Sequence, residues 1–429
     1  MEDHRTETEH DCDRITYSDA FRRLGGVTQV VAVGEMPLFH TRLTHTLKVA
    51  QLSRRIAEHV QREEGNSAII DSIGGIDPNA AEAAGLAHDL GHPPFGHVGE
   101  AALNEKCSSH GLDGYEGNAQ TFRILAKLAR RGKTDSYGLE LSPRTLRAVL
   151  KYPWLRRGAH AADRKWNAYD TEEHEFRMAR QGFSHEGQSI EAAIMDWADD
   201  ITYAVHDLED FLRAGRIPLA RLREDPVEMV EFTRAATARL AEKNSSFDTR
   251  DATEAFKEIF RTFFPALGHY SGADEDLIKL QNLSNLLIKR YVSRISVQPG
   301  EVPLNISESI QYEVSMLKQL TWHYVIDNPA LASLQQGQGR LVIVIFDRLM
   351  AWLEDAEGRK QMYRLPRRLR DLYSLAKSGP REHYPHDDAR RARAVADYIS
   401  SLTENQAIDL FERLTGVARH SVLDPWLAY

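Results

Sequence analysis

The sequence predicts an all-α protein. Its apolar residues recur three and four positions apart, which is the period of an amphipathic helix, and the strict alternation that marks a strand is scarce. Apolar residues make up 42% of the chain and charged residues 27%, near the averages of globular proteins, which excludes a disordered or fibrous chain. At about 100 to 200 residues per domain, the 429 residues allow two or three small domains or one large body with an appendage.

The first long helix is expected over 41–63, where one stripe of apolar side chains has helical spacing: Leu43, Leu47, Leu52, Ile56 and Val60. The pair Asp77-Pro78 then favours a helix start, because proline fits the first turn, where no backbone donor is needed. That helix should end at Gly91, since Pro93-Pro94 forbids its continuation. The chain is expected to turn there.

Three more helices are expected in the next part of the chain. One begins near Gly96, a second covers about 118–131, and a third opens at Ser142-Pro143 and ends at Tyr152-Pro153. Each of these boundaries follows from a proline, a glycine or a capping residue beside an apolar run.

A long core helix is expected over 186–214, with Gly215 as its C-terminal cap. Its apolar side chains again have helical spacing: Ile190, Ile194, Trp197, Ile201, Val205, Leu208 and Leu212. The charged stretches near 159–186 and 216–256 are expected to be connecting loops or exposed helices.

The second half of the chain, from about 252 to 413, repeats the helical pattern with breaks at 299–303, 337–339 and 378–385. A shift in composition places a domain boundary near residue 215, which gives a first region over 1–215 and a second over 216–429. The two regions are expected to pack as one continuous helical body.

Composition excludes several classes of protein. The longest apolar run, Leu341 to Phe346, is too short to cross a bilayer, and the polar, acidic first residues predict no secretory signal. Two cysteines cannot form a disulfide framework, so the reducing cytoplasm is the expected location. A net charge of −9 argues against a protein that coats a polyanion, although a local anion site remains open.

Two adjacent polar residues, His88 and Asp89, come directly before a Gly-His-Pro-Pro turn, where both side chains can aim at one point. His45 on an earlier helix and Asp199 on the long core helix would complete a set of two imidazoles and two carboxylates. Such a mixed set suits Mg²⁺, Mn²⁺ or Fe²⁺ and leaves positions for water and substrate. Asp200 is a rival to Asp199, but it points about 100° away from the helix face that Asp199 shares with Tyr203 and Asp207.

A second group follows the turn. His97 and Glu100 are three residues apart on the next expected helix, so Glu100 can orient the imidazole as a general acid or base. His92 lies four residues beyond His88 on the same short path. The alternative is that His97 only caps a helix or bonds to the Pro-Pro loop.

Five separated blocks of the chain occur in the order of one known family: RLTH (42–45), HDLGHPPFGHVGE (88–100), EGNAQ (116–120), LKYPW (150–154) and DWADDITYAVHDLED (196–210). The chain resembles the dNTP triphosphohydrolases, a family of HD-domain proteins. Further matching blocks are DRITYSDAFRRLGGVTQV (13–30), LTWHYVIDNPAL (320–331) and VADYISSLT (395–403), so the resemblance covers nearly the whole chain.

The resemblance implies an all-helical HD-domain core with additional C-terminal helices, and hydrolysis of a dNTP to deoxynucleoside and tripolyphosphate. It implies a divalent metal ion, Mg²⁺ or Mn²⁺ or else Fe²⁺, held by His45, His88, Asp89 and Asp199. His97, supported by Glu100, would serve proton transfer at the α-phosphorus.

The resemblance also implies the residues that bind substrate. His92, Arg42 and Lys151 would contact the phosphates. Tyr203 and Asp207 would contact the sugar, with Tyr203 placed to exclude a 2′-hydroxyl, and Gln29 would bond the 3′-hydroxyl.

The sequence departs from the family's pattern at DRKWNAY (163–169), where relatives commonly carry a Lys-Lys-Phe-Gly-type block, so only Lys165 is a candidate there. Base-contacting residues are not evident, and Arg290 and Tyr291 are the candidates. The family implies a homo-oligomer, such as a hexamer, and a dNTP or single-stranded DNA as an effector. Two other functions stay open: an HD-domain nucleoside monophosphatase or phosphodiesterase, and a low-turnover homologue that senses nucleotides or binds single-stranded DNA.

Overall fold

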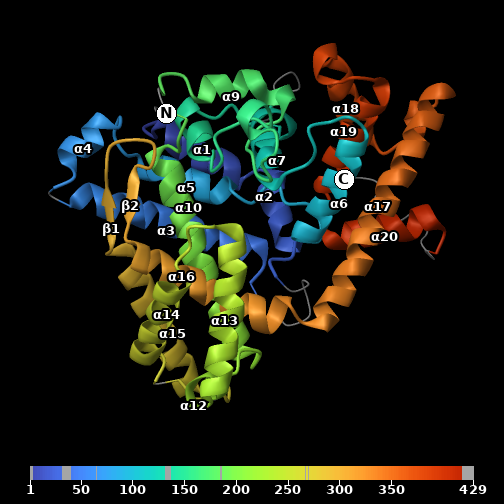
Figure 1. Ribbon diagram of the computed structural model, residues 1–429. Helices are drawn as coiled ribbons and strands as arrows, with labels where there is room; N and C mark the ends of the chain where they lie inside the picture. The colour runs from blue at the N-terminus through green and yellow to red at the C-terminus, as the bar shows by residue number, and fades with distance from the viewer. Residues whose placement is uncertain are drawn as a thin grey trace.

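The computed structural model describes residues 3–30, 40–63, 65–130, 137–183, 186–265, 267–268 and 270–417. Within these ranges the chain is helical apart from loops and one two-stranded hairpin (Figure 1). The all-α prediction is therefore confirmed. In the first half the helices are α1 (Glu7–Thr16), α2 (Asp19–Arg23), α3 (Arg42–Arg62), α4 (Ser67–Ser72), α5 (Pro78–Ala87), α6 (Gly96–Ser109), α7 (Gly117–Arg123), α8 (Pro143–Ala148), α9 (Glu173–Ala179), α10 (Ile190–Thr202) and α11 (Leu208–Arg213).

The second half contains the hairpin and the remaining helices. Strands β1 (Ile295–Val297) and β2 (Leu304–Ile306) pair antiparallel. The helices are α12 (Leu219–Glu224), α13 (Pro226–Lys243), α14 (Thr249–Phe263), α15 (Asp274–Val292), α16 (Glu308–Thr321), α17 (Pro329–Gly358), α18 (Arg367–Ser378), α19 (Asp387–Ser400) and α20 (Glu404–Thr415).

Helices α3, α5 and α10 pack against one another near the middle of the molecule (Figure 1). Helix α5 starts as predicted, because the Asp77 carboxylate accepts from the backbone N–H groups of Asn79 and Ala80 while Pro78 occupies the first turn. Its alanines and Gly85 let α3 approach closely: a Cβ on Gly85 would lie 2.6 Å from Cα of Ala50. This close packing brings the C-terminal end of α5 and the first turn of α3 together.

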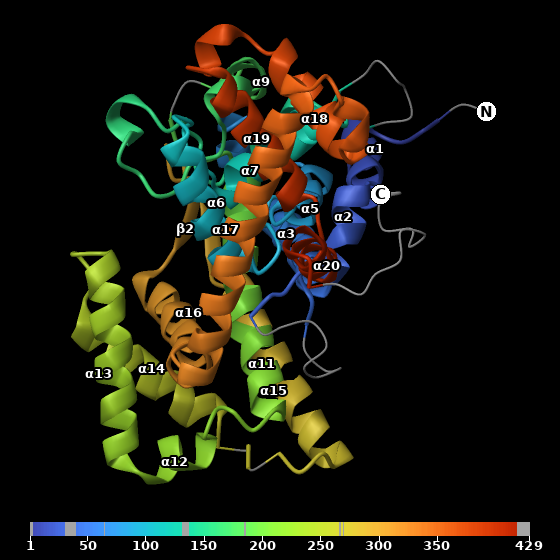
Figure 2. The ribbon, with the colours of Figure 1, turned by 90° about the vertical axis from the view of Figure 1, so that its right-hand side faces the viewer.

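The C-terminal half wraps around this core in two parts. Helices α12 to α16 form a lower lobe, and the long α17 rises from it to pack on α6, α19 and α20 (Figure 2). Each of the two largest hydrophobic clusters takes residues from both sides of residue 215. The two halves thus share their cores, and the boundary near 215 remains a prediction.

Several predicted boundaries agree with the structure and others are wrong. Helices α3 and α6 match their predictions, whereas α5 ends at Ala87 rather than at Gly91. In α3, Leu47 is 46% exposed, and Val49 lies in the core in its place. The helix opened by Pro143 ends at Ala148 rather than at Tyr152, because the KYP segment turns to meet Asn167, whose side-chain oxygen accepts from the Tyr152 N–H.

Two predicted helices contain π-helical turns. The helix expected over about 118–131 is α7 followed by a π turn over Ile124–Leu128. The core helix expected over 186–214 is α10, a π turn over Tyr203–Asp207 and α11, and Gly215 follows with φ of 65°. A π turn inside a helix often marks a functional site.

The breaks predicted at 299–303 and 378–385 are present, since the first is the hairpin loop and the second separates α18 from α19. The break predicted at 337–339 is wrong, because α17 continues through both glycines. One glycine costs a helix only about 1 kcal/mol, and the buried residues that follow outweigh it: Val342, Ile345 and Phe346. Gly339 also permits contact with α6, since a Cβ there would lie 3.2 Å from Val98 Cγ1.

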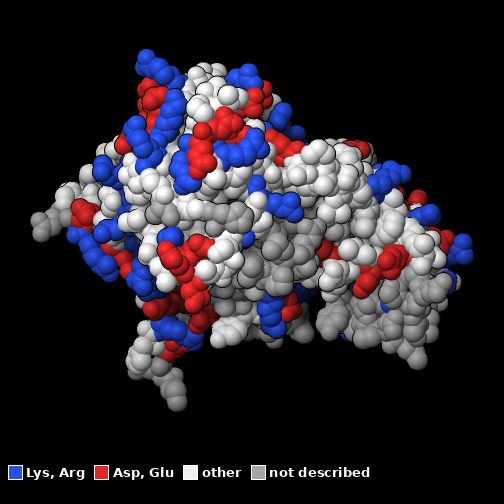
Figure 3. All heavy atoms as spheres, turned by 90° about the horizontal axis from the view of Figure 1, so that it is seen from below, with Lys and Arg blue, Asp and Glu red and all other residues white. Residues whose placement is uncertain are grey.

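Two properties of the surface bear on function. Across the described ranges, no helix combines the length and the apolar character needed to cross a membrane. On the face shown in Figure 3, acidic and basic side chains lie intermixed over the described surface. On the described part of that face, therefore, neither sign of charge is gathered in one region.

Candidate active site

The centre of the site joins three side chains from three helical segments. His45 on α3, His88 after α5 and Asp199 on α10 each offer one ligand atom, and these atoms lie within 4.8 Å of one another. His45 Nε2 is 3.0 Å from Asp199 Oδ1, and His88 Nε2 is 3.6 Å from the same oxygen. All three residues are buried. The close packing of α3, α5 and α10 thus produces a compact N and O cluster.

The His88 imidazole is oriented by the backbone. Its Nδ1 lies 2.7 Å from the carbonyl oxygen of Gly85, so Nδ1 carries the proton and donates it to that carbonyl. Nε2 is then a free lone pair, and it is buried without a hydrogen-bond partner among the described residues. A buried acceptor of this kind beside a carboxylate fits a bound cation. The ligand atoms of the cluster therefore suit a divalent metal ion.

Asp89 lies beside this cluster and joins it to two further side chains. Its Oδ2 is 3.5 Å from His88 Nε2 and accepts from Nη1 of Arg42 at 2.6 Å. Its Oδ1 is 3.1 Å from Nδ1 of His92. Burial disfavours the charged form, but the Arg42 guanidinium holds the pKa of Asp89 well below its usual range. Asp89 is therefore a carboxylate at neutral pH.

Asp199 is also kept ionised. Burial opposes this, but the ammonium of Lys151, 3.3 Å from Asp199 Oδ2, and the His45 imidazole hold its pKa below the usual range. Asp200, the rival residue, bonds instead to Lys318, whose Nζ is 2.6 Å from Asp200 Oδ1. The two adjacent aspartates thus have different partners.

A second polar group lies across the turn from the first. His92, His97 and Glu100 each offer an atom within 4.8 Å of the others. His97 is 65% exposed at its side chain, and its Nδ1 lies 2.9 Å from Glu100 Oε2. Burial would raise the pKa of Glu100, but His97 and Lys165 hold it below the usual range. An ionised Glu100 keeps the proton of His97 on Nδ1 and leaves Nε2 to exchange protons.

His92 has a different character. Burial, and after it the positive charge of Arg42, lowers the pKa of His92 to about 4. His92 is therefore neutral near pH 7 and can offer a hydrogen bond but no charge.

The turn that carries these residues is held by the C-terminal helix α20. Phe95, at its tip, has φ of 66°, a conformation that costs a non-glycine residue about 1 to 3 kcal/mol and clusters at functional sites. The backbone N–H of Phe95 donates to Glu404 Oε1 at 3.1 Å. The same carboxylate accepts from the N–H and hydroxyl of Thr28, next to Gln29.

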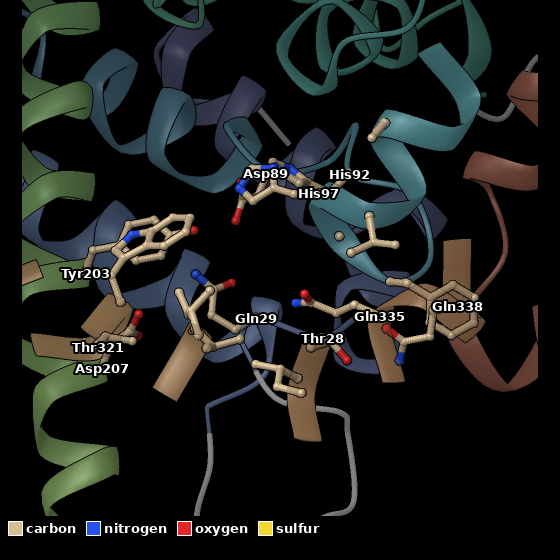
Figure 4. Close-up of a pocket in the computed structure, with 18 of the residues that line it drawn as sticks. Thr28, Gln29, Asp89, His92, His97, Tyr203, Asp207, Thr321, Gln335 and Gln338 are labelled. Carbon is tan, nitrogen blue, oxygen red and sulfur yellow. Dashed lines mark ion pairs between the residues drawn. The ribbon is translucent and has the colours of Figure 1, made fainter. Parts of the chain in front are cut away.

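A cavity of about 1180 Å³ opens onto both polar groups. Figure 4 shows Asp89, His92 and His97 on one side of it, with Thr28, Gln29 and Gln335 facing them, and Tyr203, Asp207 and Thr321 at one end. Most of the predicted site residues line it: Gln29, His88, Asp89, His92, His97, Lys151, Asp199, Tyr203 and Asp207. Lys165 lines it too.

The remaining candidates lie elsewhere. Arg42 is fully buried and is not part of the cavity lining, because its guanidinium is engaged by Asp89. The two base-contact candidates do not line the cavity either. Arg290 bonds to Glu313, and Tyr291 is buried in the hydrophobic core.

Two residues of the site were missed by sequence reasoning. Glu404 is 6% exposed and fastens the turn, and Lys318 lines the cavity with its Nζ 5.8 Å from the centre of the Tyr203 ring. Thr403 and Gln406 form a capping box that marks the start of α20, yet nothing local indicates where the Glu404 carboxylate points.

Comparison with known proteins agrees with this geometry. Residues 42–204 match the family model of the HD domain, and residues 304–413 match that of the phosphohydrolase-associated domain. Two proteins named deoxyguanosinetriphosphate triphosphohydrolase-like protein, from Corynebacterium efficiens and Streptomyces coelicolor, are 33% and 35% identical to this chain. The alignments cover 97% and 96% of this chain and 93% of each relative. A protein of the same name from Shewanella pealeana is 30% identical over 98% of this chain and 95% of its own length.

The chain belongs to the HD-domain family of deoxyguanosinetriphosphate triphosphohydrolase-like proteins. It is therefore a member of a phosphohydrolase family, and its His45, His88 and Asp199 group could hold a divalent metal ion. The HD-domain match contains all four predicted metal ligands, whereas Lys318 and Glu404 lie in the phosphohydrolase-associated domain. The cavity is thus built from both domains of the family.

Proposed function

We propose that the protein is a metal-dependent dNTP triphosphohydrolase that converts a dNTP and water to a deoxynucleoside and tripolyphosphate. The observation that carries the proposal is the buried His45, His88 and Asp199 cluster, with Asp89 beside it, at the wall of a cavity large enough for a nucleotide. Membership of a family whose members are named for dGTP triphosphohydrolysis supports the same reaction class.

The charges around the cavity support a polyphosphate as substrate. A triphosphate carries about three to four negative charges at neutral pH. The cavity lining contains the cations Lys151, Lys165, Lys243, Lys318 and Arg340. Two carboxylates and two neutral imidazoles would balance the charge of a divalent ion, which leaves no net charge at the metal site to attract a phosphate. The five lysine and arginine side chains would therefore be the groups that attract the phosphates.

A divalent metal ion, Mg²⁺ or Mn²⁺ or else Fe²⁺, would be held by His45, His88, Asp89 and Asp199, and when bound it supplies Lewis-acid stabilisation of charge at the reacting phosphate. His97, with its Nδ1 proton held by Glu100, would transfer a proton at Nε2, and we assign it to the 5′-oxygen leaving group. His92, neutral near pH 7, would contact the phosphates.

The remaining predicted residues would position the nucleotide. Lys151 bridges Asp196 and Asp199, so a phosphate oxygen would have to share its ammonium. Arg42 would act through Asp89, by orienting that carboxylate, rather than on phosphate directly. Burial and the nearby Asp210 and Asp199 raise the pKa of Asp207 well above its usual range, so a protonated Asp207 could both donate to and accept from a sugar hydroxyl.

Tyr203 and Gln29 would complete the sugar site. The Tyr203 ring packs 4.7 Å from the His45 ring, between centroids, where a 2′-hydroxyl would clash with it. Gln29 would bond the 3′-hydroxyl.

The experiment is product analysis of purified protein with each dNTP and Mg²⁺ or Mn²⁺. Release of tripolyphosphate from at least one dNTP is expected, and His88→Gln should abolish it. His59→Gln is the matched control, because His59 lies on α3 outside the cavity lining and should leave turnover unchanged. Release of pyrophosphate or single phosphate would instead indicate an HD-domain monophosphatase or phosphodiesterase. Binding without turnover would favour the nucleotide-sensing or single-stranded DNA-binding alternative.

Assembly and regulation follow from the family resemblance alone. We expect a homo-oligomer, such as a hexamer, located in the cytoplasm, with a dNTP or single-stranded DNA as an effector. Light scattering of the purified protein with and without each effector, beside its rate, measures both properties. A monomer whose rate no dNTP or oligonucleotide alters would contradict them.

A further inference from the structure

Two side-chain amides face the cavity without partners. Both the oxygen and the nitrogen of the Gln29 amide are buried and have no hydrogen-bond partner among the described residues. The Gln335 side chain, on α17, lines the same cavity but is only half-buried, and it has no hydrogen bond to another described side chain. Figure 4 shows the Gln335 side chain on the same side of the cavity as Gln29, opposite Asp89 and His92. Unpaired amides at a cavity wall are placed to bond a ligand.

The part of α17 that carries Gln335 differs in charge from the rest of the cavity. Residues 331–338 contain no charged side chain, and Leu331 and Leu334 line the cavity beside Gln335. The cations Lys151 and Lys165 instead bond to Asp199 and to Glu100, at the two polar groups described above. The phosphates are expected beside those cations. The uncharged stretch 331–338, which ends two residues before the cavity-lining Arg340, suits the uncharged part of a nucleotide.

We propose that Gln335 bonds the edge of the nucleobase. This inference rests on the proposed function, because it takes a dNTP as the ligand. A side-chain amide offers a donor and an acceptor next to each other, which is the pattern that bidentate base contacts use. Rotation of the amide by 180° exchanges the positions of its donor and its acceptor. One glutamine can therefore bond bases whose donors and acceptors are arranged differently.

The chemistry of this contact predicts how a substitution changes the preference. The variant Gln335→Glu replaces the amide by a carboxylate, which only accepts hydrogen bonds. Guanine presents two adjacent donors, N1–H and the N2 amino group, whereas thymine presents one donor between two carbonyl oxygens. The ratio of kcat/KM for dGTP to that for dTTP should therefore rise about tenfold over wild type, within the discrimination that one bidentate base contact provides.

A second variant distinguishes the loss of hydrogen bonds to the base from a change in the structure of α17. Gln335→Met keeps the length of the side chain and removes its hydrogen bonds, so KM should rise about fivefold for every dNTP while kcat is unchanged. Ser333→Glu is the control for added charge, because Ser333 is exposed on the same turns of α17 and does not line the cavity. It should leave the dGTP to dTTP ratio at the wild-type value. A wild-type dGTP to dTTP ratio in Gln335→Glu, or a wild-type KM for every dNTP in Gln335→Met, would overturn the proposal.

A binding measurement separates this inference from the proposed function. Equilibrium dialysis with deoxyguanosine and with thymidine needs neither phosphates nor turnover. In Gln335→Glu the ratio of the two dissociation constants should shift toward deoxyguanosine, even if wild type releases no tripolyphosphate from any dNTP. An unchanged ratio would overturn the role of Gln335, whatever the product analysis finds.

Discussion

The carboxylate of Glu404 accepts two hydrogen bonds from Thr28, one from its backbone N–H at 2.9 Å and one from its hydroxyl at 2.6 Å, across 376 positions of the chain. Glu404 also accepts from the N–H of Phe95, in the turn that carries His92 and His97. One buried side chain on α20 therefore holds the segment before α3 and the turn before α6 in fixed relation.

We expect Glu404→Ala to reduce kcat/KM for the preferred dNTP by about 10²-fold, the cost of a displacement near 1 Å in a catalytic group. The substitution removes both acceptor oxygens and leaves the N–H groups of Thr28 and Phe95 without them. Metal content, measured on the same samples, should stay at the wild-type level, because Glu404 does not touch His45, His88 or Asp199. Asn405→Ala, an exposed change on the same turn of α20, is the control. A rate near wild type in Glu404→Ala would show that the turn is held by other contacts.

The contacts of Glu404 illustrate which parts of the molecule were predictable. Helix starts such as Asp77-Pro78 and pairs such as His97 and Glu100 depend on residues within four positions, where periodicity and capping rules operate. Glu404 with Thr28 and Lys318 with Asp200 depend on the packing of distant helices, about which the local pattern contains no information.

Packing decides two further features that the local pattern does not. The resemblance implies a phosphate contact for Arg42, and the structure places its guanidinium buried against Asp89. The glycines at 337 and 339 suggested a break, but the buried face that follows them keeps α17 helical. At these glycines, long-range contacts outweigh a local preference of about 1 kcal/mol per glycine.

A buried ion network joins the two halves of the chain, and breaking it should be costly. Arg123 on α7 bonds Glu172 at 2.6 Å and Asp397 on α19 at 2.7 Å, with all three side chains buried. Arg123→Met leaves the buried Asp397 without a cation and Glu172 with Lys127 alone, which should lower the free energy of unfolding by about 3 to 5 kcal/mol. Urea unfolding followed by circular dichroism measures this.

The control for Arg123→Met is Arg261→Met, which removes an exposed arginine that pairs with Glu258 one turn away. It should leave the unfolding midpoint unchanged, since exposed ion pairs contribute little. Adding Asp397→Asn to Arg123→Met should recover part of the loss, because one unpaired charge is then removed. Equal midpoints for Arg123→Met and wild type would contradict the prediction.

His206 should make the fold less stable in acid. Burial, then the positive charge of Lys48, whose Nζ lies 2.9 Å from His206 Nδ1, lowers the pKa of His206 to about 2. An unfolded histidine titrates near pH 6.5, so below that pH the unfolded chain binds a proton that the folded chain does not. The free energy of unfolding should therefore fall as pH drops from about 6.5, by at most about 1.4 kcal/mol per pH unit for this group.

The variant His206→Gln tests this sign. A glutamine oxygen can accept from Lys48 but does not titrate, so the variant should lose less stability than wild type between pH 7 and pH 5. Urea unfolding at pH 7, 6 and 5 gives the two slopes, and other titrating groups contribute equally to both proteins. Parallel slopes would mean that His206 is protonated in the folded state.

Removal of the metal ion should destabilise the protein as well as inactivate it. A ligand that binds only the folded state stabilises it by about 2.7 kcal/mol at 100 times its Kd. Chelation of protein saturated with Mn²⁺ should therefore lower Tm, and resaturation should restore it.

The variant that decides whether this stabilisation comes from the buried cluster is His88→Gln, because His88 Nε2 is the buried acceptor that has no partner in the protein. Its Tm should be insensitive to Mn²⁺, and equilibrium dialysis should find one Mn²⁺ fewer per chain than in wild type. In wild type the His59 imidazole lies 3.8 Å from the Glu63 carboxylate, away from the metal cluster. The variant His59→Gln should therefore respond to Mn²⁺ as wild type does. If Mn²⁺ raises the Tm of His88→Gln as much as that of wild type, the stabilising ion binds elsewhere, and the cluster of His45, His88 and Asp199 is not the metal site.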